Sequence, residues 1–367
     1  MSESVDLFPA PESRMLNSTD DVRIKSLRPL LPPAILMEEI PAHPEACRAV
    51  AQGRREVADV VRGDSDRLVV VVGPCSIHHP EAGLEYARRL RRVADQHRED
   101  LCIVMRVYFE KPRTIVGWKG LINDPHLDGS YAINDGLRLA RRFLLNVVQL
   151  GLPAGTEFLD PITPQFIADL VSWGAIGART VESQVHRELA SGLSMPVGFK
   201  NGTGGTIQIA IDAIRSSAHP HHFLSVTKQG VAAIVATAGN PECHVILRGG
   251  SHGPNFSREH VESTVSKLES AGVPARVMID CSHANSSKNH ERQADVARDI
   301  ASQVASGSHA IFGVMLESFL VDGRQEPHKG KELTFGQSIT DACLGWERTE
   351  PVLAELAAAV RARRSRG

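Results

Sequence analysis

LVVVVGPCSIHHPEAGLEYARRLRRVADQ, residues 68–96, joins a short apolar run to an amphipathic stretch through a Gly-Pro-Cys-Ser turn. The run Leu68–Val72 is apolar at every position, which is typical of a strand buried on both faces of a parallel sheet. From Glu81 to Gln96 apolar residues recur three and four positions apart, which predicts a helix with one buried face. The stretch is therefore a strand followed by a helix, the repeating unit of α/β proteins.

This strand–helix unit recurs along the chain. Further strand-like runs are Cys102–Tyr108, Ala154–Phe158, Ala175–Ala178, Pro196–Phe199, His244–Leu247, Arg276–Ile279 and Ile311–Leu316. Helical stretches follow at Asn134–Gln149, Pro164–Trp173, Ser183–Ser191, Thr206–Ser217, Arg258–Ala271 and Glu291–Ala305, with a last helix at about Ser338–Arg363. Eight such units favour an α/β fold of the closed (β/α)8 TIM-barrel type over residues 68–363. Counting strands alone leaves an open doubly wound sheet as the alternative.

Three segments lie outside the repeat. Residues 1–22 are polar and are expected to be flexible. Residues 23–67 form an N-terminal helical and extended extension, broken at Leu31-Pro32-Pro33, to which we assign regulatory or oligomer contacts. Residues 219–237 contain two strand-like runs around Gln229-Gly230 and are predicted to form an inserted β-hairpin.

Composition narrows the function classes. The net charge is -2 over 367 residues, so no long-range field recruits nucleic acid or an anionic membrane. The basic C-terminus, with Arg361, Arg363, Arg364 and Arg366, is interpreted as a solvated tail. Six cysteines without a CxxC pair suit a reducing compartment, and no apolar run is long enough for a membrane span. A cytoplasmic protein is expected.

Each predicted strand ends in a group that can bind metal, carry charge or transfer a proton. These groups are Cys75, Arg106 with Lys111, Glu157, Arg179, Lys200, Arg248, Asp280 with His283, and Glu317. Barrel enzymes place their chemistry at the carboxyl ends of the strands. Cations gathered there, with Arg113 as a further one, predict two ligands that carry phosphate or carboxylate groups. The alternative is ordinary salt bridging with Glu110, Glu157 or Glu182.

A second set of strand-end residues has mixed donor atoms. Cys75, His283, Glu317 and Asp341 offer a thiolate, an imidazole and two carboxylates, which a divalent Mn, Fe, Co or Zn ion accepts. Alternatively, Cys75 is a core thiol, and Asp341 is a first-turn carboxylate of the last helix, favoured by the helix dipole.

The motifs around these residues resemble those of class I 3-deoxy-7-phosphoheptulonate (DAHP) synthases, from about Arg23 to Ala359. They are GPCSIH (73–78), RVYFEKPRT (106–114), GWKG (117–120), GAIGAR (174–179), GFKNGT (198–203), LRGG (247–250), DCSHANS (280–286) and SITDAC (338–343). Gly204, His79 and Ser251 depart from common family residues and affect the expected loop geometry only.

The resemblance implies condensation of phosphoenolpyruvate with erythrose 4-phosphate, the first step of the shikimate pathway to aromatic amino acids. It implies a divalent metal on Cys75, His283, Glu317 and Asp341, and phosphoenolpyruvate on Arg106, Lys111, Arg179, Lys200 and Arg248. The sugar phosphate would contact Lys111, Pro112, Arg113, Thr114 and Asp341, and Lys111 or Glu157 would transfer protons. It also implies inhibition by an aromatic amino acid, with Phe223-Leu224-Ser225 favouring phenylalanine, and a homodimer or homotetramer.

Other functions stay open at this point. A 3-deoxy-octulosonate 8-phosphate synthase shares the barrel and the phosphoenolpyruvate chemistry, but residues 111–114 argue against it. A non-catalytic relative that only binds an aromatic amino acid would be favoured by loss of a metal or phosphate residue, and none is lost. A class II aldolase-type lyase would need more histidines in the metal set than His283.

Overall fold

The computed structural model describes residues 19–113, 115, 117–327 and 332–366. Eight parallel strands close into a barrel in the order β1-β10-β9-β8-β5-β4-β3-β2. Closure is made by β1 against β10, where Val72 pairs with Leu316, so the open sheet is excluded and the predicted TIM barrel is confirmed. The strands are β1 Leu68–Gly73, β2 Leu101–Arg106, β3 Ala154–Glu157, β4 Trp173–Ile176, β5 Val197–Lys200, β8 Cys243–Leu247, β9 Val277–Asp280 and β10 Ile311–Glu317.

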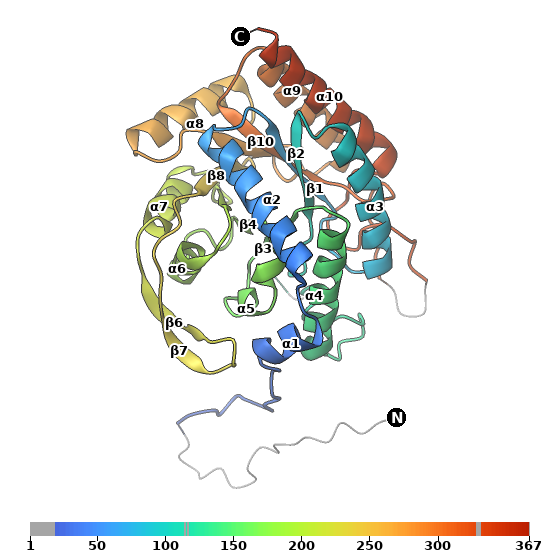
Figure 1. Cartoon of the computed structure of the whole chain (residues 1–367), viewed down its shortest axis with the longest axis vertical. Helices are drawn as coiled ribbons and strands as arrows, with labels where there is room; N and C mark the ends of the chain where they lie inside the picture. Colours follow the sequence, from blue (N-terminus) through green and yellow to red (C-terminus); the bar gives the residue numbers. More distant parts are fainter. Residues whose placement is uncertain (1–18, 114, 116, 328–331, 367) are drawn as a thin grey trace.

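Helices surround the barrel (Figure 1). They are α3 Pro80–Gln96, α4 Ile133–Gln149, α5 Pro164–Ile167 with the 3-10 turn η1 Ala168–Leu170, α6 Gln184–Gly192, α7 Gln208–Ser217, α8 Arg258–Ser270, α9 Gln293–Ala305 after the 3-10 turn η2 His290–Arg292, and α10 Trp346–Arg364. The predicted helix Pro164–Trp173 is too long, because Trp173 begins β4 and packs inside the barrel. None of the described helices is long and apolar enough to cross a membrane.

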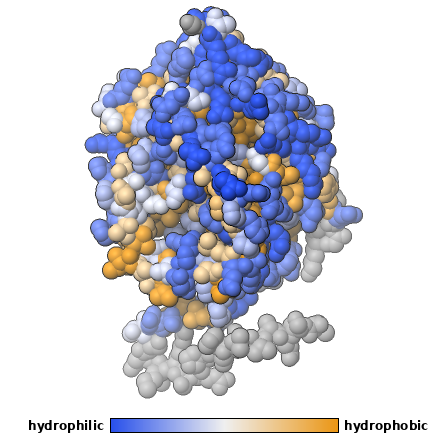
Figure 2. Space-filling view, viewed as in Figure 1, coloured by the Kyte–Doolittle hydropathy of each residue, from blue (hydrophilic) through white to orange (hydrophobic). Residues whose placement is uncertain are grey.

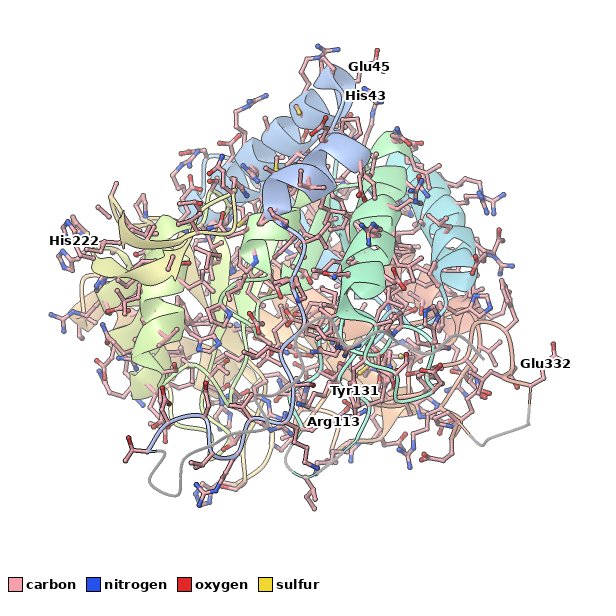
Figure 3. The ribbon with its side chains drawn as sticks, turned by 90° about the horizontal axis from the view of Figure 1, so that it is seen from below. His43, Glu45, Arg113, Tyr131, His222 and Glu332 are labelled. Carbon is pink, nitrogen blue, oxygen red and sulfur yellow. The ribbon has the colours of Figure 1, made fainter. Side chains whose placement is uncertain are left out.

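The extension before the barrel closes its amino end. It contains α1 Pro33–Glu39 and α2 Pro44–Arg62, and α2 crosses in front of the strands in Figure 1. Its residues Val57, Val60 and Val61 are buried in the cluster that fills the barrel, with Val69, Val71, Val104, Ile246 and Met278. Each such valine contributes about 1.5–3 kcal/mol by leaving water. The opposite end of the barrel stays available for a site, and Arg113 lies there, far from His43 and Glu45 of α2 (Figure 3).

The predicted hairpin is confirmed. β6 His222–Val226 pairs antiparallel with β7 Ala232–Ala236, with Leu224 opposite Ile234. The hairpin lies beside α6 and α7 in Figure 1, and Figure 2 shows apolar surface at the same side of the molecule. Leu224 and Ile234 are exposed large apolar side chains of the hairpin. Phe223 and Ser225, on the other face, are half-buried.

The interpretation of the C-terminal arginines as a solvated tail is wrong for Arg363, although Arg361, Arg364 and Arg366 are exposed. Arg363 is 4% exposed and donates to the carbonyl of Asp66, and Arg364 pairs with the carboxylates of Asp66 and Asp100. Because Asp66 precedes β1 and Asp100 precedes β2, these contacts hold the end of α10 next to the starts of both strands.

Candidate active site at the mouth of the barrel

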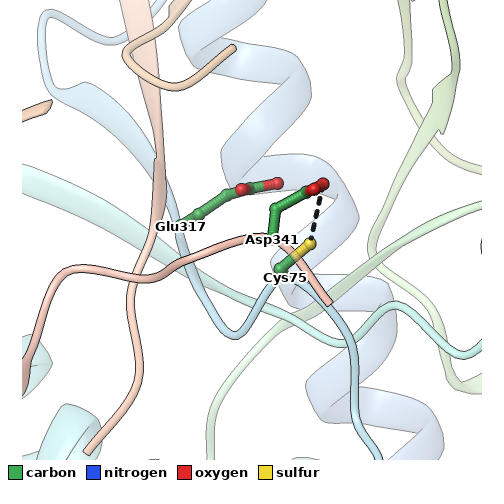
Figure 4. A group of neighbouring side chains, drawn as sticks. All are labelled: Cys75, Glu317 and Asp341. Atoms are coloured by element: carbon green, nitrogen blue, oxygen red, sulfur yellow. Dashed lines mark hydrogen bonds between the residues drawn. The ribbon is translucent and has the colours of Figure 1, made fainter. Parts of the chain in front are cut away.

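Three side chains with metal-binding donors meet at the carboxyl ends of the strands. Cys75 follows β1, Glu317 ends β10, and Asp341 lies in the loop before α10 (Figure 4). One donor atom from each lies within 4.8 Å of the others, and the Sγ of Cys75 is 3.4 Å from Oδ2 of Asp341. Three of the four predicted ligands therefore share one place.

Asp341 reaches this place from a loop, so the prediction that it opens the last helix is wrong. Residues 338–344 form bridges to the chain after β10, with Ser318 opposite Leu344, Gly323 opposite Cys343 and Arg324 opposite Ser338. These partners satisfy the backbone groups that a helix would otherwise use, and α10 begins only after Gly345. The helix dipole is therefore no explanation for this carboxylate.

His283, the fourth predicted ligand, lies outside the three-residue cluster. Its Nδ1 is 3.2 Å from Oδ2 of Asp280, the last residue of β9, and its side chain is one quarter exposed. Its backbone has a φ of +59°, a left-handed conformation that turns the chain sharply after the strand.

Lys111 lies against the cluster. Its Nζ is 2.9 Å from Sγ of Cys75 and 3.6 Å from Oδ2 of Asp341. Burial and the nearby Glu317 raise the pKa of the Cys75 thiol to about 11, although Lys111 acts in the opposite direction. The thiol therefore keeps its proton at neutral pH until a cation takes its place.

Like Lys111, which lies 3.6 Å from Asp341, two further predicted anion-binding cations pair within the protein. Arg106, 1% exposed, donates to Glu317 at 2.8 Å and to the carbonyls of Pro74 and Cys75, while its guanidinium lies 3.6 Å from the ring centre of Tyr108. Lys200 donates to Asp280 at 2.8 Å. Salt bridging thus does occur, but with strand-end carboxylates other than the three considered from sequence.

Two other cations lack such partners. Among the described residues, neither Arg179 nor Arg248 has an ion-pair partner within 4.0 Å. Burial lowers the pKa of the Arg248 guanidinium; the charge of Asp280 acts against this, and the positive charge of Arg179 acts in the same direction as burial. Two guanidinium groups without a paired carboxylate form a place for an anion.

The loop after β2 carries the remaining predicted contacts. Arg113 is exposed and donates its Nε–H to the carbonyl of Trp118, and Pro112 is half-buried beside it. Thr114 lies outside the described residues.

Glu157 ends β3 and is 8% exposed. A Cβ at Gly177 would come within 2.1 Å of its Oε1, so only glycine there lets the carboxylate lie against the backbone of the next strand's end. The carboxylate of Glu157 therefore lies beside the carboxyl end of β4.

Three buried polar residues near this mouth are outside the predicted ligand sets: Asp280, Glu110 and Tyr108. The sequence places Asp280 at a strand end and indicates Glu110 only as a salt-bridge partner. Glu110 stands next to Lys111 but points to the neighbouring loop, where its Oε1 accepts from Asp160 N and Thr163 Oγ1 at 3.3 Å. The hydroxyl of Tyr108 is buried without a hydrogen-bond partner among the described residues, which no sequence signal indicates.

A cavity of about 540 Å³ lies elsewhere, between α2 and the end of α3. Glu56, Arg67 and Leu152 are among its lining residues, and it shares none with the mouth.

Comparisons with known proteins agree with this geometry. The sequence model of the DAHP synthetase I family matches residues 39–354. A Phe-sensitive phospho-2-dehydro-3-deoxyheptonate aldolase from Escherichia coli is 60% identical over 345 residues, 94% of this chain and 98% of the relative. A tyrosine-inhibited one from Schizosaccharomyces pombe is 52% identical over 361 residues, 97% of each chain.

A solved structure of phospho-2-dehydro-3-deoxyheptonate aldolase from Francisella tularensis SCHU S4 superposes with a TM-score of 0.91 at 55% sequence identity. The match covers 93% of this chain and 99% of that one. With both a family model and near-full-length relatives in agreement, this chain belongs to the DAHP synthetase I family.

Proposed function

We propose that this chain condenses phosphoenolpyruvate with D-erythrose 4-phosphate and water to give 3-deoxy-D-arabino-heptulosonate 7-phosphate and phosphate. This is the first step of the shikimate pathway to chorismate and the aromatic amino acids. The observation that carries the proposal is the cluster of Cys75, Glu317 and Asp341 within 4.8 Å, together with two guanidinium groups that have no carboxylate partner in the described part of the chain.

The donor set fits a divalent metal. One thiol and two carboxylates already converge, and His283 would supply an imidazole as the fourth donor. Such a mixed set suits Mn, Fe, Co or Zn. A bound ion would supply Lewis-acid polarisation of the aldehyde oxygen of the sugar phosphate. Lys111 donates to the sulfur of Cys75 at 2.9 Å, and its positive charge favours the thiolate that Cys75 becomes when it loses its proton as a ligand.

The cations would hold the two anionic substrates side by side. Arg179 and Arg248, with Arg106, Lys111 and Lys200, would bind phosphoenolpyruvate. Lys111, Pro112, Arg113 and Thr114, with Asp341, would bind the sugar phosphate. Holding both substrates converts a bimolecular reaction into a positioned one.

In the proposed reaction the enol carbon of phosphoenolpyruvate bonds to the aldehyde carbon, water adds to the carbon that bears the phosphate, and phosphate departs. Protons must reach the new hydroxyl and leave the attacking water. Lys111 belongs to both proposed substrate sites, and Glu157 is the last residue of β3. We assign proton transfer to these two residues.

Phosphate release from both substrates tests the proposal. We expect release that requires erythrose 4-phosphate, stops with excess chelator and returns with a divalent metal, and that Cys75→Ala abolishes. Arabinose 5-phosphate in place of erythrose 4-phosphate should give little release. Preference for arabinose 5-phosphate would instead assign 3-deoxy-octulosonate 8-phosphate synthase activity.

Inhibition by an aromatic amino acid is a further part of the proposal. It is supported by relatives named Phe-sensitive, tyrosine-inhibited and Trp-sensitive. Phe223-Leu224-Ser225 favours phenylalanine, and Phe223 and Ser225 share the half-buried face of β6. Titration of activity with Phe, Tyr and Trp checks this, and strong inhibition by Tyr alone would refute it.

Three sequence predictions stay predictions. They are a homodimer or homotetramer, a cytoplasmic location, and regulatory or oligomer contacts for residues 23–67.

A further inference from the structure

One buried carboxylate lies in contact with residues of both proposed subsites. Asp280 ends β9 and is 0% exposed. Its Oδ2 accepts from Nζ of Lys200 at 2.8 Å and lies 3.2 Å from Nδ1 of His283. Its Oδ1 accepts from the backbone N–H of Ser282 at 3.0 Å and from the Ser282 hydroxyl at 2.6 Å. A single oxygen is thus shared by a proposed phosphoenolpyruvate residue and a proposed metal ligand.

The contact fixes which nitrogen of His283 can bind a cation. Nδ1 of His283 lies 2.5 Å from Oγ of Ser282 and 3.2 Å from Oδ2 of Asp280, so Nε2 is the ring nitrogen left to face a metal. Because the Ser282 hydroxyl donates to Asp280, its oxygen accepts from Nδ1, which favours the tautomer with the proton on Nδ1. The backbone holds this arrangement: Asn285 Nδ2 donates to the carbonyl of Asp280 at 2.8 Å, and Lys288 N donates to that of His283 at 2.7 Å.

Asp280 also holds the ammonium group of Lys200 in place. This side chain is 4% exposed, so its ammonium needs an anionic partner to stay charged in the barrel. Asp280 is 0% exposed and accepts from Lys200 at 2.8 Å, so the carboxylate and the ammonium compensate each other's burial. Asp280 is therefore the negative charge that both groups share.

We propose that Asp280 is a positioning residue that couples the two subsites, aiming Nε2 of His283 at the metal and holding Lys200 for phosphoenolpyruvate. The inference rests on the proposed function, since that function gives Lys200 and His283 their ligands. It adds that metal affinity and phosphoenolpyruvate affinity depend on one another through Oδ2 of Asp280.

The first test is Asp280→Asn, which keeps the shape of the side chain but removes its charge. Zn²⁺ affinity is measured by competition with a coloured chelator, and phosphoenolpyruvate affinity by calorimetry on the metal-loaded protein without sugar phosphate. We expect Zn²⁺ affinity to fall about 10- to 100-fold and phosphoenolpyruvate affinity to fall about tenfold or more. Loss of only one affinity in a folded variant would overturn the coupling.

A second variant tests the coupling through Asp280 even if Asp280→Asn does not fold. Lys200→Met leaves the whole charge of Asp280 to His283, so Zn²⁺ affinity should tighten by about threefold or more although Lys200 is no metal ligand. The matched control is Arg179→Met. Arg179 belongs to the same proposed anion site, but in the described structure it forms no ion pair with Asp280. The Zn²⁺ affinity of this variant should therefore stay within about twofold of wild type. Equal Zn²⁺ affinities in the two variants would overturn the proposal.

Failure of the inference is distinguishable from failure of the proposed function. If wild type releases no phosphate from the two substrates, the proposed function is wrong, whatever the affinities are. If wild type is active but the variants do not move both affinities as stated, only the role of Asp280 is wrong.

Discussion

Glu110 offers a test of how the loop that carries Lys111 is held. The residue is 4% exposed, and its Oε1 accepts from Asp160 N and Thr163 Oγ1, which join the loop after β2 to the loop after β3. Burial, and then the nearby charge of Asp160, raise the pKa of the Glu110 carboxyl to about 8 from 4.5. The perturbation we consider is Glu110→Gln, which keeps a carbonyl oxygen for both hydrogen bonds and cannot ionise.

The magnitude follows from proton linkage. Below pH 4.5 the carboxyl is protonated in both states, and its stabilising contribution is fully present. Between pH 4.5 and 8 the folded state binds the extra proton, so the free energy of unfolding falls by about 1.4 kcal/mol per pH unit. Above pH 8 the whole contribution, about 5 kcal/mol, is lost.

Glu110→Gln should therefore gain on wild type as pH rises, by about 3 kcal/mol between about pH 5 and pH 7. Urea unfolding of both proteins at several pH values across this range measures the gain, with Glu99→Gln on the exposed turn after α3 as the control. Because Lys111 follows Glu110, phosphate release should also persist to higher pH in the variant. A stability difference that is constant across pH would refute the reasoning.

Three further changes test other parts of the structure. Cys75→Ala should weaken Zn²⁺ binding by at least about tenfold, measured by metal content after gel filtration, and full retention of metal would contradict the proposed ligand set. Gly177→Ala places a Cβ 2.1 Å from Oε1 of Glu157, so the carboxylate must move. The rate of phosphate release should then fall about 100-fold at unchanged metal affinity. An unchanged rate would show that Glu157 does not transfer protons. Arg141→Met removes a fully buried guanidinium that donates to two backbone carbonyls and to both carboxylate oxygens of Asp169. The free energy of unfolding, measured in urea, should fall by about 3–5 kcal/mol, and a fall of less than about 1 kcal/mol would contradict this role.

The sequence by itself determined the eight strand–helix units and the positions of their polar strand ends, whereas the pairing of β1 with β10 decided that the sheet closes. The apolar run Leu68–Val72 predicts β1, and the two strand-like runs around Gln229-Gly230 predict the hairpin. Such elements can be predicted because the spacing of apolar residues that marks a strand or a helix is a local property of the sequence. The carboxyl ends of parallel strands all lie on one side of a barrel, so the positions of Glu157 and Glu317 at the ends of predicted strands are enough to assign both to the mouth.

Only the tertiary structure decided which of these residues touch. Cys75 meets Asp341 across 266 positions of sequence, and it does so because residues 338–344 bridge to the chain after β10 instead of continuing a helix. In the same way Lys200 meets Asp280 across 80 positions, on two strands separated by β8. Such contacts depend on strand order, register and loop path, which are set by packing among distant segments and leave no periodic mark in the sequence.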